Sequence, residues 1–597
     1  MQNIKKLSNI LTPNERFRTM LLLGMVLIMS FIEMLGIASI LPFIAVLSNP
    51  ELIETNTHLS LVFKLASNFG IDTKNRFLFI LGIIVFLLLI TSISFKALTL
   101  YFQTRFIKMC QFNIAIRLVK HYLYQPYSWF LNRNSATLGK TILSEVSNVI
   151  GKGLTPMIIL ITNITLTFAI FMLLLYVDPK LAVIVLFTIC SFYGLVYKLN
   201  RNLLSKIGKE VFLANEKRFN ILSEAFGASK EVKVGGLEEI YVNQFSEPSK
   251  KIALRTALVT IMSEMPRFTL EAVAFGGMLL ITLYFMTLSS DITNVIPTIA
   301  LYALAGYRLM PALQKIFASL TSLRVVGPSL DSLYNELKNL KFTVPNKNIN
   351  SLEFNNHICL NNINYNYPNA SKTALKNINL VIPINKTIGL VGATGSGKTT
   401  TVDIILGLLE AQEGTLEVDG KVIEKDNKRA WQRHIGYVPQ QIFLSDNTIS
   451  ANIAFGHNIN DINQKAVEQA AKIAKLHEFV INELPLKYQT VVGERGVRLS
   501  GGQRQRIGIA RALYNKPKVL VFDEATSALD NLTEKAVMDA VHNSGNKITK
   551  ILVAHRLSTV KNCDKIYLFE KGKVKNQGTF EELIKINDDF RESAKNT

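Results

Sequence analysis

Six long apolar stretches fill most of the first half of the sequence. A helix needs about 20 mostly apolar residues to cross a lipid bilayer, and uninterrupted apolar runs of that length are typical of membrane-spanning helices. The stretches cover residues 19–47, 77–103, 153–177, 180–199, 256–287 and 292–318. The sequence therefore predicts an α-helical transmembrane domain of six helices within residues 1–340.

The charges between these stretches predict how the helices are oriented. The segment between the second and third stretches carries mostly basic side chains against Glu145, among them Arg105, Lys108, Arg117, Lys120, Arg133 and Lys140. The segment between the fourth and fifth stretches is also rich in lysine and arginine, although it carries several glutamates. Because cytoplasmic loops of membrane proteins are enriched in basic residues, we expect both segments and both chain ends on the cytoplasmic side.

The net charge of +21, from 66 basic and 45 acidic residues, narrows the possible partners. A basic excess suits a nucleic acid, an anionic membrane or the cytoplasmic loops of a membrane protein. The sequence contains no zinc knuckle or RNA-binding aromatic motif, and its four cysteines form no CxxC pair. We therefore expect membrane lipids rather than nucleic acid as partners, and neither a disulfide framework nor a cysteine metal site.

The segment HLSLVFKLASNF (58–69) follows the first apolar stretch. Its apolar residues Leu59, Val62, Phe63, Ala66 and Phe69 repeat at helical spacing. Two interpretations are open: a short amphipathic helix lying on the outer membrane face, or a loop helix packed on the protein itself.

The sequence changes character near residue 345. Proline and asparagine in KFTVPNKNIN (341–350) indicate a linker, and residues 345–597 have the pattern of an α/β domain. Within it, GLVGATGSGKTT (389–400) lies between a strand-like and a helix-like segment. The spacing Gly392-x4-Gly397-Lys398-Thr399 is that of a phosphate-binding loop in its required strand–loop–helix context.

This loop predicts a binding site for ATP with Mg²⁺. Backbone N–H groups of such a loop surround phosphate oxygens, and the following helix N-terminus adds the positive end of its dipole. Lys398 would reach the β- and γ-phosphates, and the Thr399 hydroxyl would bind Mg²⁺. The predicted nucleotide contacts are Gly392, Thr394, Gly395, Ser396, Gly397, Lys398, Thr399 and Thr400.

Two acidic residues end the strand-like run in VLVFDEATSALD (519–530). Acidic side chains at the carboxyl end of a buried strand lie where an α/β sheet binds its ligands. Asp523 would hold Mg²⁺ directly or through water, and Glu524 would orient and polarise the attacking water.

The segment RLSGGQRQRIGIARAL (498–513) has the form of a helix start, which makes it a second anion site. Its predicted contacts are Ser500, Gly501, Gly502 and Gln503. Since one loop already binds the phosphates, this second site has a role if it faces the γ-phosphate of ATP bound to another copy of the chain.

Taken together, the phosphate loop, LSGGQ (499–503), VLVFDE (519–524), SALD (527–530), YVPQQ (437–441) and VAHRLS (553–558) resemble the ATPase domain of ABC transporters. The resemblance covers about residues 345–590. It implies that Tyr367 stacks on adenine, that Gln440 senses Mg²⁺ and water, that His555 contacts the γ-phosphate, and that Asp530 crosses a dimer interface. It also implies a homodimer in which both ATP sites hydrolyse.

The first half resembles exporters of the type IV arrangement. In these proteins two long cytoplasmic loops carry short coupling helices, and QPYSWFLNRN (125–134) and ILSEAFGASKE (221–231) occupy the matching places. Closure of the ATPase dimer would act through these loops and turn the cavity outward.

Four basic residues lie inside the predicted spans: Lys96, Arg267, Arg308 and Lys315. Charges inside a bilayer are costly and commonly functional. One interpretation is that they extend to the headgroups or pair with acids, as Arg267 could with Glu271 or Glu264, and as Glu33 could with Arg308 or Lys96. The other is a basic ring in the cavity that suits a phosphate or diphosphate headgroup.

A closer resemblance favours the basic ring. SFIEMLGIASILPFIAVLSNP (30–50), MPRFTLEAVAF (265–275) and YRLMPALQK (307–315) are similar to PglK-type flippases of lipid-linked oligosaccharides. This implies a polyprenyl-diphosphate glycan as substrate, whose diphosphate meets the four basic residues. Separately, we expect a bacterial cytoplasmic membrane as the location. The alternative is an exporter of another amphipathic cargo, such as a lipid A-like glycolipid, a peptide or a drug.

Overall fold

The computed structural model describes the chain except residues 1, 49, 69–72, 289–295, 341–351, 369, 371, 525–530, 543–547, 555 and 596–597. Its contacts divide the chain into two compact units, which are described separately. The first comprises Met1–Gln125 and Asn132–Phe342, and the second comprises Pro126–Leu131 and Thr343–Thr597. The predicted linker at 341–350 lies outside the described residues.

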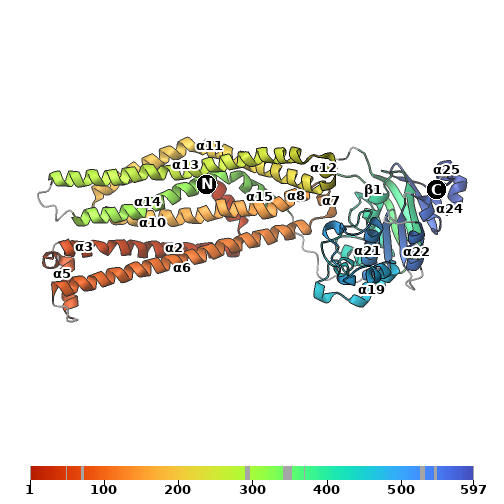
Figure 1. Ribbon diagram of the computed structural model, residues 1–597, viewed down its shortest axis with the longest axis horizontal. Coiled ribbons are helices and arrows are strands. Elements are labelled where there is room, and N and C mark those ends of the chain that lie inside the picture. The colour runs from red at the N-terminus through yellow and green to blue at the C-terminus, as the bar shows by residue number, and fades with distance from the viewer. Residues whose placement is uncertain are drawn as a thin grey trace. The chain divides into compact units, whose positions relative to one another are not determined.

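The first unit is built of helices (Figure 1). Its long helices are α2 (Pro13–Ala38), α6 (Lys74–Leu123), α10 (Thr155–Val177), α11 (Pro179–Gly227), α13 (Glu238–Leu288) and α14 (Ile296–Val325). Shorter ones are α1 (Gln2–Ile10), α3 (Ile40–Ser48), α4 (Leu52–Thr55), α5 (Thr57–Ser67), α8 (Ser135–Lys140), α9 (Val146–Val149), α12 (Ser229–Gly235) and α15 (Gly327–Asn339). Two π-helical turns, Thr141–Glu145 and Ile150–Leu154, join α8 to α10.

The helix ends follow from local sequence. Thr12 and Glu15 form a reciprocal capping box at the start of α2, with Pro13 in the first turn. In the polar segment YVDPK (176–180), the Asp178 carboxylate accepts hydrogen bonds from the N–H groups of Lys180 and Leu181, so that α11 begins directly after α10 ends.

Four helical segments of the described residues are long and apolar enough to cross a membrane: Pro13–Ser48, Lys74–Leu123, Ser135–Val177 and Pro179–Gly227. They contain the first four predicted spans. The fifth and sixth predicted spans coincide with α13 and α14, apart from residues outside the description, so the count of six stays a prediction. Large apolar side chains such as Phe79, Phe86 and Leu87 are exposed along α6, as expected for a lipid-facing surface.

The helices pack in pairs along their length. α2 runs beside α6, α11 beside α13, and α10 lies against both α14 and α2 (Figure 1). Buried Ile37, Leu166, Ile170 and Ala305 form a core between α2, α10 and α14. This packing brings polar residues from distant parts of the sequence to one level of the bundle.

The segment predicted to be amphipathic is helical as α5, but it packs on the protein. Leu59, Phe63 and Ala66 contact the cluster of Val46, Ile53 and Phe77, whereas Val62 is exposed. For these three residues, the interpretation of a loop helix packed on the protein is therefore the one that holds. Phe69 lies outside the described residues.

The second unit contains two sheets. A four-stranded antiparallel sheet has the order β2-β1-β4-β5, and a six-stranded, mainly parallel sheet has the order β10-β9-β3-β8-β7-β6. The strands are β1 (His357–Tyr365), β2 (Leu375–Pro383), β3 (Thr387–Gly392), β4 (Glu413–Val418), β5 (Lys421–Val422), β6 (Ile435–Val438), β7 (Val519–Asp523), β8 (Thr549–Val553), β9 (Lys565–Glu570) and β10 (Lys573–Gly578).

Helices cover these sheets and complete the predicted α/β domain. They are α16 (Lys398–Ile405), α17 (Lys428–Gln432), α18 (Ile449–Ile453), α19 (Gln464–Ile473), α20 (His477–Asn482), α21 (Gly501–Tyr514), α22 (Asn531–His542), α23 (Leu557–Val560), α24 (Phe580–Ile586) and α25 (Asp588–Lys595). The short helix α7 (Tyr127–Phe130) belongs to the segment 126–131 that is grouped with this unit, although it lies outside the predicted domain of residues 345–597. β7 and β8 are buried along their whole length, as parallel strands covered on both faces should be. The carboxyl ends of β3 and β7 therefore meet at one edge of a rigid sheet.

Candidate nucleotide site and membrane cavity

The phosphate loop connects β3 to α16, as the sequence predicts. Gly392 and Gly397 have φ angles of 154° and 106°, which side chains other than glycine rarely adopt. A Cβ at Gly392 would lie 2.3 Å from the Phe569 carbonyl oxygen, and one at Gly397 would lie 2.7 Å from Leu375 Cδ2. The two glycines thus allow the loop to lie close against β9 and β2.

Lys398 is buried beneath this loop. Its Nζ donates hydrogen bonds to the carbonyl oxygens of Gly392 (2.7 Å) and Ala393 (3.1 Å). Burial lowers the pKa of Lys398, while nearby Glu524 and Asp523 act in the opposite direction. The buried Ser396 hydroxyl has no hydrogen-bond partner among the described residues. A bound polyphosphate would supply acceptors to both groups, so the loop fits the predicted ATP.

The two acidic residues end β7 beside the loop. Asp523 is buried and accepts a hydrogen bond from the Tyr437 hydroxyl (3.3 Å). Glu524 has a φ of 52°, and its Oε2 accepts a hydrogen bond from Gln440 Nε2 at 2.8 Å. The Thr399 hydroxyl, Gln440 and Asp523 are oxygen donors of the kind that Mg²⁺ prefers. These three residues would hold the ion, which would neutralise charge on the phosphates when bound.

A further acid at this edge was not singled out by the sequence. Asp403, on α16, is buried, and its pKa is raised to about 6 by burial first and by Asp523 second. Its position one turn after Thr399 on a predicted helix was the available signal. Asp403 is thus a further carboxyl group close to Asp523 at this edge of the sheet, and both causes favour its protonated form.

Tyr367 lies next to the phosphate loop. Its hydroxyl shares a hydrogen bond with Thr400 Oγ1 at 3.0 Å, and its ring meets Tyr365 edge to face. The structure therefore places the residue predicted to stack on adenine at the base of α16.

LSGGQ begins α21 as predicted. Ser500 caps this helix: its Oγ accepts a hydrogen bond from the Gln503 N–H, and the Gln503 side chain accepts one from the Ser500 N–H. Gly501 and Gly502 occupy the first turn. His555 and Asp530, the remaining predicted nucleotide contacts, lie outside the described residues.

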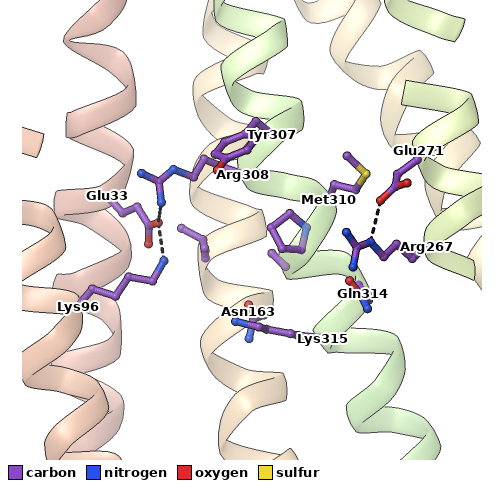
Figure 2. Close-up of a pocket in the computed structure, with 13 residues that line it drawn as sticks. Glu33, Lys96, Asn163, Arg267, Glu271, Tyr307, Arg308, Met310, Gln314 and Lys315 are labelled. Atoms are coloured by element: carbon purple, nitrogen blue, oxygen red, sulfur yellow. Dashed lines mark hydrogen bonds and ion pairs between the residues drawn. The ribbon is translucent and has the colours of Figure 1, made fainter. Parts of the chain in front are cut away.

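In the first unit, the four predicted basic residues meet at one cavity of about 380 Å³ (Figure 2). Lys96 comes from α6, Arg267 from α13, and Arg308 and Lys315 from α14. Residues more than 200 positions apart in sequence are thus brought together by helix packing. Asn163, Tyr307 and Gln314, which the sequence did not indicate, also line the cavity.

Acidic residues pair with three of the four cations. Glu33 Oε1 accepts hydrogen bonds from Lys96 Nζ at 2.8 Å and from Arg308 Nη1 at 3.0 Å. Arg267 Nε pairs with Glu271 Oε1 at 2.7 Å. Lys315 is exposed, with no ion pair among the described residues. The structure therefore has features of both interpretations of the sequence. The four cations line a cavity, as in the basic ring, and three of them are paired with acidic residues.

Known families match both halves of the chain. Residues 19–311 match the family described as ABC transporter transmembrane region, and residues 375–527 match the family described as ABC transporter. The alpha-hemolysin translocation ATP-binding protein HlyB of Escherichia coli is 30% identical over 533 residues, which cover 86% of this chain and 71% of HlyB. This chain belongs to the ABC transporter family.

Other relatives and one solved structure agree with this assignment. The heterocyst differentiation ATP-binding protein HepA of Nostoc is 29% identical, over 83% of this transporter and 81% of HepA. A bacterial Atm1-family ABC exporter with ATP bound shares the fold with a TM-score of 0.77, at 20% identity, over 97% of this chain and 98% of that one. The predicted fold class, a helical transmembrane domain followed by an ABC ATPase domain, is confirmed.

The family gives the general activity. The protein is an ABC exporter half-transporter that couples ATP hydrolysis to transport across a membrane. The sequence predicted this activity from the ATPase motifs, of which the phosphate loop and the pair Asp523–Glu524 lie at the sheet edge described above.

Proposed function

We propose that this exporter flips a polyprenyl-diphosphate oligosaccharide across the bacterial cytoplasmic membrane, as a homodimer with both ATPase domains in the cytoplasm. The observation that carries the proposal is the charge of the cavity. In each copy of the chain, four cations and the two carboxylates of Glu33 and Glu271 line it, which leaves a net charge of +2 per copy. A diphosphate diester is a dianion, so this excess of positive charge suits its headgroup while its lipid tail stays in the bilayer.

The cavity offers suitable donors as well as charge. Arg308 and Arg267 carry guanidinium groups that bind phosphate oxygens in pairs, and Lys96 and Lys315 act as point charges. Asn163 and Gln314 add amide donors and acceptors that suit sugar hydroxyls. An apolar drug would bind weakly to such a lining. The polar groups of the lining would lose their water and find no hydrogen-bonding partners in the drug.

In the ATPase domain, we assign roles to the residues at the sheet edge. Lys398 would bind the β- and γ-phosphates, Asp523 and Thr399 would hold Mg²⁺, and Glu524 would polarise the attacking water with Gln440 holding its carboxylate. Ser500 and the first turn of α21 would face the γ-phosphate bound to the partner copy.

The test is ATP-dependent flipping in proteoliposomes of an undecaprenyl diphosphate that carries a fluorescent disaccharide. We expect flipping by the wild type, and loss of it in Glu524→Gln and in the double variant Arg308→Ala with Lys315→Ala. Lys206→Ala with Lys209→Ala, which removes two exposed cations of α11 outside the cavity, is the matched control and should flip normally.

A second candidate follows from the relatives. HlyB and the leukotoxin export ATP-binding protein LtxB of Aggregatibacter actinomycetemcomitans, 32% identical over 79% of this chain, are named for toxin export. If the wild type hydrolyses ATP but flips none of the lipid, a peptide or a lipid A-like glycolipid replaces the diphosphate lipid as the expected cargo.

A further inference from the structure

Glu33 differs from the other charged groups at the membrane cavity. Its side chain is 3% exposed, whereas those of Lys96 and Arg308 are 45% and 32% exposed. Burying a carboxylate is costly unless cations compensate it, and here one oxygen receives both cations while Glu33 Oε2 has no hydrogen-bond partner among the described residues. The Glu33 carboxylate lies between Arg308 and Lys96 (Figure 2), and it is far more buried than either of them although it lines the same cavity.

We propose that Glu33 is a fixed counter-charge that limits how tightly the cavity holds an anionic headgroup and so promotes its release. This inference rests on the proposed function, because it assumes that the cargo is an anionic lipid. It adds a residue that sets the balance between affinity and turnover.

The geometry lets Glu33 act without leaving its place. An ammonium group has three donors and a guanidinium has five, and the contacts to Glu33 use one nitrogen of each side chain. The other donors remain available on the exposed side. A phosphate could therefore bind Lys96 and Arg308 from the cavity while the Glu33 carboxylate, held between them, opposes its charge.

The expected effect of the charge has a definite sign. In Glu33→Gln the side chain keeps its shape and an acceptor oxygen, but the net charge of the cavity lining rises from +2 to +3 per copy. An anionic headgroup should then bind about tenfold more tightly, given a unit charge at close range in a partly buried site. Because a carrier must also let its cargo leave, the maximal flipping rate should fall several-fold.

A purely structural role for Glu33 predicts the opposite. If Glu33 served chiefly to join α2 to α6 and α14, Glu33→Gln would loosen the site, and affinity would fall or stay unchanged. Two controls separate the effects. Glu33→Asp keeps the charge and should retain affinity and rate near the wild type. Glu247→Gln removes a carboxylate of α13 that lies outside the cavity lining, is 81% exposed and pairs with Lys217, and it should leave affinity and flipping unchanged.

The experiment measures the dissociation constant and the maximal flipping rate of the fluorescent undecaprenyl-diphosphate disaccharide, for the full-length protein in membranes of zwitterionic lipid. Tighter binding with slower flipping in Glu33→Gln, and recovery in Glu33→Asp, supports the proposal. Equal or weaker binding in Glu33→Gln, with normal flipping by the wild type, overturns the role of Glu33 and leaves the proposed function intact. A wild type that neither binds nor flips the probe overturns both.

Discussion

At the scale of single residues, Glu524 is the group on which hydrolysis should depend most. Its carboxylate accepts a hydrogen bond from Gln440 at 2.8 Å and lies at the same sheet edge as Asp523. Glu524→Gln keeps the shape of the side chain but cannot accept a proton from water, so ATP hydrolysis should fall about a hundredfold or more while ATP binding persists. Steady-state hydrolysis and nucleotide binding of the full-length protein check this.

The control for Glu524 is Glu478→Gln, which changes an exposed glutamate of α20 in the same domain and should leave hydrolysis unchanged. Hydrolysis by Glu524→Gln within threefold of the wild type would show that another group activates the water.

Residues differ in how far the sequence alone could place them. Gly392–Thr400 form one continuous segment, from the end of β3 into the first turn of α16, whose spacing is specific to a phosphate-binding loop, so their arrangement was predictable. The pairing of Glu33 with Lys96 and Arg308 joins positions 63 and 275 residues apart. The sequence indicated both pairs as alternatives, but only the packing of α2 against α6 and α14 shows that one carboxylate oxygen serves both cations.

At the scale of elements, Gly208 sets how closely α11 approaches α14. A Cβ at this position would lie 2.3 Å from the Val325 carbonyl oxygen and 3.2 Å from Val325 Cα, both backbone atoms that cannot rotate away. Gly208→Ala should therefore force the helices apart and lower the free energy of unfolding by about 1–3 kcal/mol. Thermal unfolding of the detergent-solubilised protein measures the change.

Gly194, on the same helix, provides the matched control. A Cβ there meets no atom within 4 Å, so Gly194→Ala should leave stability unchanged or raise it by up to roughly 1 kcal/mol through helix propensity. Equal unfolding temperatures for the two variants would contradict the close approach of α11 to α14.

The ends of helices could be predicted where particular residues in the local sequence mark them. Asp178 and Pro179 mark the turn between α10 and α11 in the sequence itself. The first apolar stretch, however, is divided at Ser39 between α2 and α3, a break that its continuous apolar composition does not signal. Likewise, the spacing in 58–69 indicated a helix. It did not show whether the apolar face of this helix lies on the membrane or on the protein, because periodicity does not identify the neighbour that covers that face.

At the scale of the whole molecule, the proposed homodimer requires two copies to complete each ATP site. One chain carries one phosphate loop and one LSGGQ helix start, and each is proposed to act on the same ATP only across the dimer. Lys398 and Ser500 are suitable residues for testing the two halves of a site. Lys398 lies beneath the phosphate loop that follows β3, and Ser500 caps the LSGGQ helix start at α21.

Mixed dimers test this arrangement with equal numbers of lesions. When one copy carries Lys398→Ala and the other Ser500→Ala, both changes fall in the same shared site and the second site is intact. When one copy carries both changes and its partner is wild type, each shared site carries one lesion. Differently tagged copies, purified as mixed dimers, should therefore hydrolyse ATP at up to about half the wild-type rate in the first case and far more slowly in the second. If each chain instead completed its own site, the order would reverse, because the wild-type copy in the second dimer would remain active.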